Sequence, residues 1–274
     1  MHRPALLAAA LTAAALAAST AVAAAPTPVA TVSTSPAPQR SVSDAAALWS
    51  SRSSAKPLSG VVIAIDPGHN GGNSSHLAQI NRLVWIGTEW KACNTVGTST
   101  NAGFPEHRFT WQLAKRLRAR LEALGATVRL TRTSDTGWGP CVTTRGRFGA
   151  KVHANLLISL HGDGLASAQH GFVVIRPGRI KGYTDDIYAR SRTLALDVRA
   201  GLGQVHLSRS TAYGGDGLDV RTDLGTLNLS NVPAVLVELG NMRNAHDALL
   251  MSSRTGQARY AAGLLDGIRR FLRR

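Results

Sequence analysis

Cysteine, aromatic and acidic residues are all scarce in this chain of 274 residues. It has two cysteines, 5% aromatic residues, and 16 acidic residues against 31 lysines and arginines. Cys93 and Cys141 lie far apart, without the close CxxC spacing of paired zinc-ligand cysteines, which argues against a small structural zinc module. After the first residues no run of about 18 apolar residues occurs, so the sequence predicts no transmembrane segment and a mature protein that is soluble outside the cytoplasm.

The net charge of +15 does not by itself indicate nucleic-acid binding. The sequence has no helix-turn-helix, zinc finger or aromatic RNA-binding strand, and its basic residues are dispersed, so we expect no nucleic-acid partner. A basic surface on an exported protein fits a polyanionic envelope, either wall polymers or anionic lipid headgroups. A solvated surface without a partner explains the charge equally well.

The N-terminus has the pattern of a secretory signal peptide. A short basic start precedes an apolar run over Leu6–Ala18, and small residues at Ala21–Ala23 or Ala23–Ala25 offer cleavage sites. We therefore assign residues 1–25 to a signal peptide and expect export to the periplasm, cell wall or medium. Residues 26–56, rich in Pro, Ser, Thr and Ala, read as a flexible linker, which leaves 57–274 as the folded domain. Two cysteines in an oxidising compartment predict a Cys93–Cys141 disulfide.

Short apolar runs alternate with helical patterns in the folded part. This alternation predicts an α/β domain of three layers, with a mixed, mostly parallel sheet of about six strands and helices on both faces. The expected strands are Val61–Ile65, Val128–Thr131, Leu156–Leu160, Phe172–Ile175 and Ala234–Val237. The expected helices are Glu106–Gly125, Thr144–His153, Asp185–Leu202, Ala245–Met251 and Gln257–Leu272.

Three of the expected strands end in ionisable residues. VVIAIDPGH ends at His69, LLISLHGDG contains His161, and AVLVELGN contains Glu238. Since the carboxyl ends of parallel strands share one edge of a sheet, where ligand sites form, we expect these three side chains to converge. Two histidines and a carboxylate are a common catalytic zinc set that leaves one coordination position for water.

The residues alone leave the identity of the metal-binding carboxylate open. Glu238 and Glu106 are the leading candidates, Glu106 because it opens a helix, where the helix dipole favours an acid. Further candidates are Asp163 and Glu89, and also Asp66, for which we expect hydrogen bonds within its own turn.

The long Asn73–Gly103 segment has no clear predicted element, and we expect Cys93 to hold it in place. Tryptophans in these loops either line a substrate groove or cover a loosely packed face; they are Trp85, Trp90 and Trp138.

From about Leu58 to Leu272 the chain resembles the zinc-dependent N-acetylmuramoyl-L-alanine amidases of the amidase-3 family. The resemblance rests on IAIDPGHNGG, EHRFTWQLAKRLRARLEALGATVRLTR, NLLISLHGDG, and VPAVLVELGNMRN followed by LLDGI, in that order. It implies that His69, Glu106 and His161 bind Zn²⁺ and that Glu238 is catalytic. It also implies a peptidoglycan hydrolase that cuts the amide between N-acetylmuramic acid and L-alanine of muropeptides. We expect the protein to be a monomer.

Four departures from the family pattern border the expected groove. Asn70 stands where a second glycine is usual, Asp163 belongs to an unusual HGDG, and Asn241-Met242 replaces an apolar pair. The fourth departure is the longer Asn73–Gly103 segment. They put substrate preference in question and leave the four functional positions untouched. The alternatives are a non-catalytic peptidoglycan-binding protein on the same fold and a zinc peptidase acting within the stem peptide.

Overall fold

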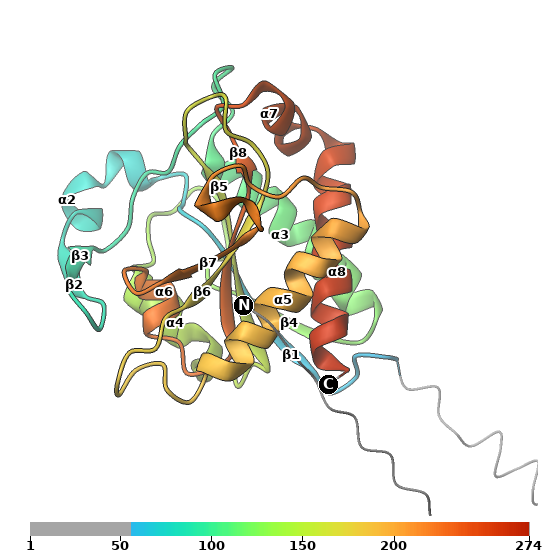
Figure 1. Cartoon of the computed structure of the whole chain (residues 1–274). Coiled ribbons are helices and arrows are strands. Elements are labelled where there is room, and N and C mark those ends of the chain that lie inside the picture. The colour runs from blue at the N-terminus through green and yellow to red at the C-terminus, as the bar shows by residue number, and fades with distance from the viewer. Residues whose placement is uncertain (1–55, 274) are drawn as a thin grey trace, which may run out of the picture. The chain divides into compact units, whose positions relative to one another are not determined.

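A six-stranded sheet forms the centre of the domain (Figure 1). The computed structural model describes residues 56–273, so the assigned signal peptide and nearly all of the linker lie outside the described residues. The strand order is β4-β1-β5-β8-β6-β7. The strands are β1 (Val62–Pro67), β4 (Thr127–Leu130), β5 (Leu156–Asp163), β6 (Val173–Pro177), β7 (Leu218–Arg221) and β8 (Ala234–Asn241). Among residues 56–273 no helix is long and apolar enough to span a bilayer.

The sheet is mixed, as the sequence predicts. β4, β1, β5 and β8 are parallel neighbours, whereas β6 pairs with β8 in the antiparallel direction and β7 pairs with β6 in parallel. Parallel strands need a crossover connection of about a dozen residues or more. Only residues 164–172 join β5 to β6, so β6 returns in the opposite direction. The short, half-polar β7 is the sixth strand, which the sequence did not locate.

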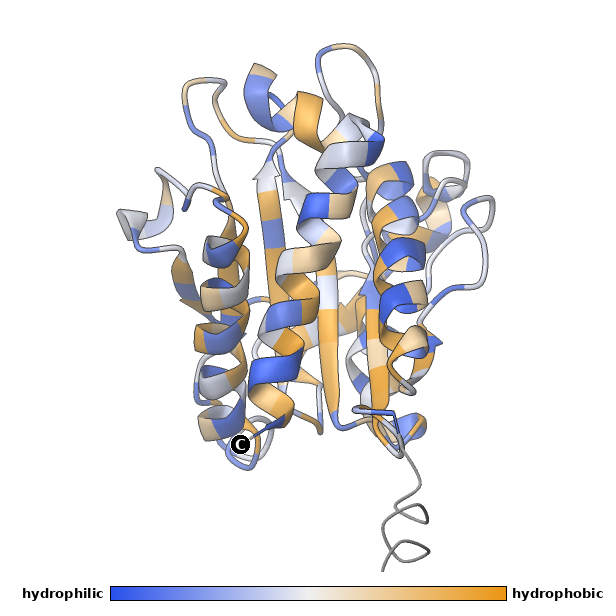
Figure 2. Ribbon diagram, turned by 90° about the vertical axis from the view of Figure 1, so that its right-hand side faces the viewer, coloured by the Kyte–Doolittle hydropathy of each residue, from blue (hydrophilic) through white to orange (hydrophobic). Residues whose placement is uncertain are grey.

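Helices cover both faces of the sheet because each long strand is apolar on both sides. Ile63, Ile65 and Ile158 pack with α3 (Glu106–Ala123), α5 (Tyr188–Gln204) and α8 (Arg254–Leu272). The residues between them, such as Ala64 and Leu157, pack with α4 (Val142–Lys151) and α6 (Gly225–Asn228). Alternate residues of a strand point to opposite faces, so uninterrupted apolar runs give the strongly hydrophobic strands visible behind the helices in Figure 2.

The predicted helices are all present with shifted ends, and α7 spans Ala245–Ser252. Helix α8 begins three residues earlier than predicted, because the Ser253 side chain accepts a hydrogen bond from the backbone N–H of Gly256.

The Asn73–Gly103 segment contains structure that the sequence did not reveal. Its elements are a 3-10 turn η1 (Asn73–Ser75), a short helix α2 (Leu77–Ile80), and an antiparallel hairpin of β2 (Leu83–Trp85) and β3 (Trp90–Ala92).

Candidate active site

The four residues singled out in the sequence lie together at the carboxyl edge of the sheet. His69 follows β1, and His161 in β5 is directly opposite Glu238 in β8 in the strand register. Glu106 is the first residue of α3. Parallel pairing of β1, β5 and β8 therefore brings the two histidines and Glu238 to one edge, and α3 brings Glu106 to them.

His69, Glu106 and His161 form a close cluster. Oε1 of Glu106 lies 3.0 Å from Nε2 of His69 and 3.0 Å from Nδ1 of His161. One ligand atom from each residue falls within 4.8 Å of the others, so the cluster can hold a metal ion. Of the two leading carboxylates, Glu106 is the one that this arrangement places between the histidines.

Burial and charge act in opposite directions on Glu106. Burial alone would raise the pKa of its carboxyl, but the charge of His69 and the hydrogen bonds from His161 and His69 outweigh burial and lower it. The pKa of His69 is correspondingly raised, because burial, which would lower it, is outweighed by Glu106. The buried carboxylate is thus stabilised by the two imidazoles, and a bound cation would also stabilise it.

Glu238 completes the group without joining the hydrogen-bonded cluster. Its Oε2 is buried and accepts no hydrogen bond from any part of the chain that the structure describes. Burial, followed by the charges of Glu106 and Asp163, raises the pKa of Glu238 well above its ordinary range. A buried carboxylate oxygen without a partner is costly, which marks Oε2 as an atom whose partner is a substrate, a water molecule or a cation.

Comparisons with known proteins point to one family. Residues 63–270 match the family model described as N-acetylmuramoyl-L-alanine amidase. N-acetylmuramoyl-L-alanine amidase Rv3717 of Mycobacterium tuberculosis is 41% identical over 230 residues, which cover 81% of this chain and 91% of that protein. The crystal structure of the N-acetylmuramyl-L-alanine amidase Ami1 from Mycobacterium smegmatis matches with 36% identity and a TM-score of 0.74, over 78% of this chain and 98% of that one. The apo form of Ami1 from Mycobacterium abscessus gives the same identity and TM-score, over 78% and 100% of the two chains.

The chain belongs to the N-acetylmuramoyl-L-alanine amidase family. The family and the α/β fold expected from the quoted motifs are both confirmed.

Three backbone groups hold the amidase cluster in place. The carbonyl oxygen of Thr95 lies 3.0 Å from Nδ1 of His69, so Nδ1 carries a proton, and Nε2 faces Glu106. The backbone N–H of Thr98 donates to Oε2 of Glu106 at 3.0 Å, and that of Gly162 donates to Oε1 at 3.1 Å. These hydrogen bonds come from the backbone and do not depend on the type of side chain, so the sequence gives no direct indication of them.

Two glycines allow this close approach. A Cβ on Gly68 would fall 2.3 Å from Cε1 of His161, so the glycine of the DPGH stretch makes room for the second histidine. Gly97 has a φ of +86°, and a Cβ there would fall 2.9 Å from both Oε2 of Glu106 and Cδ2 of His69. Gly97 is therefore the one feature of the sequence that indirectly indicates the hydrogen bond from the neighbouring Thr98 N–H to Glu106.

Asp66 does not bond within its own turn, so that prediction is wrong. It is fully buried, and it accepts hydrogen bonds from Arg145 at 2.6 Å, from Ser159 at 2.7 Å and from Thr131. Burial would raise the pKa of Asp66, but the Arg145 charge and these hydrogen bonds lower it. Arg145 also donates to the carbonyl oxygen of His69 at 2.8 Å. The pair fixes the loop that carries the first histidine.

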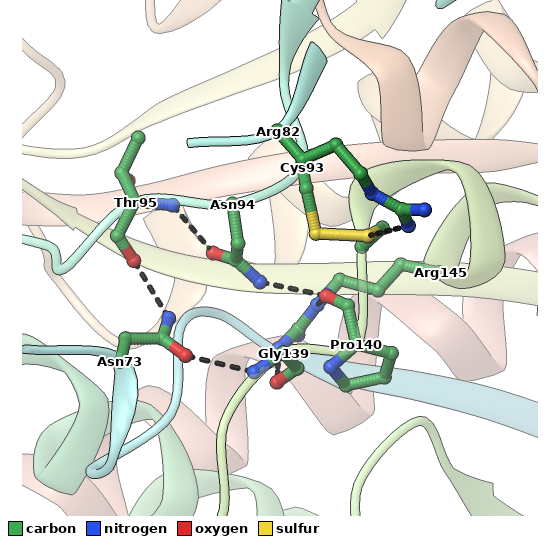
Figure 3. The surroundings of a disulfide bond; sticks show 9 residues. Asn73, Arg82, Cys93, Asn94, Thr95, Gly139, Pro140 and Arg145 are labelled. Atoms are coloured by element: carbon green, nitrogen blue, oxygen red, sulfur yellow. Dashed lines mark hydrogen bonds between the residues drawn. A yellow bond between two sulfur atoms is a disulfide. The ribbon is translucent and has the colours of Figure 1, made fainter. Parts of the chain in front are cut away.

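The predicted disulfide between Cys93 and Cys141 is present, with a Cα–Cα distance of 4.4 Å. Beside it, Asn94 donates to the carbonyl oxygen of Pro140 at 2.7 Å, and Asn73 accepts from the backbone N–H of Gly139 at 2.8 Å (Figure 3). The Asn73–Gly103 segment is therefore attached to the loop before α4. This attachment positions Thr95 against His69.

A cavity of about 300 Å³ lies next to the cluster and is lined in part by His69, His161 and Ile86. None of the three loop tryptophans lines it. Trp85 and Trp90 are exposed on the β2–β3 hairpin, and Trp138 stacks on His76. The interpretation that the tryptophans line a groove is not supported for this cavity.

Two departures from the family pattern have visible partners. Asn70 accepts a hydrogen bond from the backbone N–H of Gly71 and donates to the carbonyl oxygen of Gly139, so it joins the two loops of the disulfide region. Asp163 follows a register shift in β5 and accepts a hydrogen bond from the Tyr213 hydroxyl at 2.8 Å. Both residues act in building the rim of the site. Glu89, a minor candidate, lies 3.6 Å from Lys91 on the hairpin, outside the cluster.

Proposed function

We propose that this chain is an exported, zinc-dependent N-acetylmuramoyl-L-alanine amidase. It would cleave the amide between N-acetylmuramic acid and L-alanine of peptidoglycan or muropeptides, acting as a monomer in the periplasm, cell wall or medium. The observation that carries the proposal is the Glu106 carboxylate held 3.0 Å from nitrogens of His69 and His161, with the unpartnered carboxyl of Glu238 opposite His161. The names of the relatives supply the bond that is cut.

The chemistry of the donor set fits zinc. Two imidazoles and one carboxylate are a common protein ligand set of catalytic zinc. His69, Glu106 and His161 would hold the ion, and Glu106 brings the negative charge that a divalent cation balances in a buried site. When bound, zinc supplies a Lewis acid that polarises the amide carbonyl and makes water more acidic.

Glu238 would transfer the proton in the reaction. Its carboxylate accepts a proton from the attacking water as the oxygen bonds to the amide carbon, and it returns that proton to the amide nitrogen as the C–N bond breaks. The raised pKa suits the second half of this step, because a carboxyl with a high pKa retains the proton until the amine leaves. The absence of a hydrogen-bond partner among residues 56–273 leaves Oε2 available for the water.

Digestion of purified muropeptides, followed by mass spectrometry, tests the reaction. We expect free stem peptides with an intact L-alanine amino terminus, and loss of these products with a chelator. Cleavage inside the stem peptide would indicate the zinc peptidase instead, and binding without cleavage would indicate the non-catalytic receptor.

Variants then separate the residue roles. E238Q should retain about one zinc ion per chain and lose hydrolysis, whereas H69A should lose the zinc. H246A, at a histidine whose side chain is 71% exposed, is the control and should retain both. An active E238Q enzyme would contradict the role of Glu238, and full zinc occupancy in H69A would contradict the ligand assignment.

A further inference from the structure

A second groove, of about 680 Å³, runs along the outer side of α3 to the junction of α7 and α8. Four basic side chains line it: Arg108, Lys115, Arg116 and Arg254. No acidic residue is among its lining residues. Arg108, Lys115 and Arg254 are exposed, so the positive charge faces solvent rather than the protein interior.

None of these four cations forms a salt bridge with an acidic residue within residues 56–273, whereas two basic residues nearby do. On the same helix, Arg118 forms a salt bridge with Glu122 at 2.8 Å, and on α8 Arg270 forms one with Asp266 at 2.7 Å. A patch of like charges weakens the folded state by self-repulsion, and an anion would relieve that repulsion.

One of the four cations is oriented in advance by a neutral side chain. Nε of Arg116 donates to Oε1 of Gln257 at 3.0 Å, and Gln257 itself is only 1% exposed. Gln257 in turn donates to Oε1 of Gln112 at 2.8 Å and to the carbonyl oxygen of Met251 at 2.9 Å. These hydrogen bonds fix the guanidinium without neutralising it. Within residues 56–273 its two terminal NH₂ groups have no hydrogen-bond partner, so they are available for the planar, bidentate contact that arginine makes with phosphate.

We propose that this groove binds a chain-like polyanion in which phosphate groups alternate with sugar or polyol units, such as an anionic wall polymer. The cations match the phosphates, and the apolar side chains of Phe104 and Ala119 in the groove match the carbon units. The row of cations along one helix suits a linear polymer. The site needs none of the residues that cut the amide bond, so it stands independently of the proposed hydrolysis.

The groove lies on the helix that carries Glu106. Arg108 follows Glu106 by two residues, and Arg108 to Ala119 is about 17 Å of helix at 1.5 Å per residue. A polymer held there would keep the cluster of His69, Glu106 and His161 close to the wall.

The test measures binding of the full mature protein to synthetic poly(glycerol phosphate) over a range of salt concentrations. We expect K115Q/R116Q to bind about five- to twentyfold more weakly than the wild type, since each exposed charge pair contributes a factor of up to about five. The slope of log affinity against log salt should fall by about 1.5. Because Arg116 also holds the buried Gln257, R108Q/R254Q serves as a second variant at two exposed positions.

R118Q/R120Q is the matched control, because it also removes two positive charges from α3, at positions that do not line the groove. It should bind within about twofold of the wild type, and all variants should hydrolyse soluble muropeptides normally. Equal loss of binding in R118Q/R120Q would mean that net charge alone acts, and would overturn the proposal. Phosphatidylglycerol vesicles are the second arm. Groove variants that lose vesicle binding but keep polymer binding would identify a membrane site and overturn it equally.

Discussion

Replacing Arg145 with methionine tests whether the buried pair beneath His69 holds the site together. Arg145 donates five hydrogen bonds, one of them to Asp66 and one to the carbonyl oxygen of Pro67. Its side chain is only 3% exposed. Methionine fills most of the volume but leaves the fully buried Asp66 carboxylate without its cation. Breaking a buried pair by removing one partner costs about 3–5 kcal/mol. Since domains of this size unfold at about 5–15 kcal/mol, R145M should still fold with a much smaller margin.

Urea unfolding at neutral pH, followed by circular dichroism, measures this loss. With a slope of about 2 kcal/mol per molar, the midpoint of R145M should fall by about 1.5–2.5 M. R147M is the control, because Arg147 lies on the same helix and is exposed. It should unfold within about 0.5 kcal/mol of the wild type.

A double variant separates the charge effect from the loss of packing. D66N/R145M leaves no unpaired charge, so it should be more stable than the sum of the two single changes implies. If R145M unfolded within about 1 kcal/mol of the wild type, or if the two single changes were simply additive, the account of a coupled buried pair would be wrong.

Three further predictions concern the charge of Asp66, the glycine beside Glu106 and the disulfide. The pKa of Asp66 is lowered from its ordinary value of 3.8. The ionised carboxylate therefore stabilises the fold above that pH, and this stabilisation is lost as the pH falls through the lower pKa of the folded state. The difference in unfolding free energy between wild type and D66N should shrink in urea titrations below about pH 4. G97A should lose its bound metal to a chelator faster than the wild type, whereas G103A, with a similar φ of +81° and open space around a new Cβ, should not. Equal loss in both would refute the contact argument. Removing the disulfide in C93A/C141A opens a loop with a sequence separation of 48 and should cost about 4 kcal/mol in urea unfolding, and a loss below about 1 kcal/mol would show that the hydrogen bonds of Asn73 and Asn94 suffice.

Features that depend on local pattern could be predicted from the sequence. Unbroken apolar runs marked β1, β5 and β8, and the helical spacing after Pro105 marked α3, because these patterns reflect burial on both faces of a sheet or on one face of a helix. The place of His69, His161 and Glu238 then followed from parallel pairing. The strands could not decide between Glu106 and Glu238 as the carboxylate beside the histidines, because Glu106 comes from a helix whose docking depends on the whole core.

Features that depend on distant contacts could not be predicted. Asp66 and Arg145 are 79 residues apart, and nothing in the DPG turn points to α4. The Thr95 carbonyl oxygen and the Thr98 N–H act through the backbone, so their side chains give no signal. β7 is short and half polar, and the β2–β3 hairpin has no regular alternation of apolar residues. Neither element therefore has a sequence pattern from which it could be predicted.

Helix α3 carries Glu106 at its first position and the cations of the proposed polymer groove on its outer side. Glu106 is fixed by the backbone N–H groups of Thr98 and Gly162, neither of which contacts the outer groove. A polymer that binds the cations on the outer side therefore has no direct path by which to shift the carboxylate. We expect the groove to change where the enzyme acts and leave the chemistry unaltered. Groove variants should accordingly raise the apparent KM on intact walls that carry the polymer, with kcat unchanged, and should behave as wild type on walls from which the polymer has been removed.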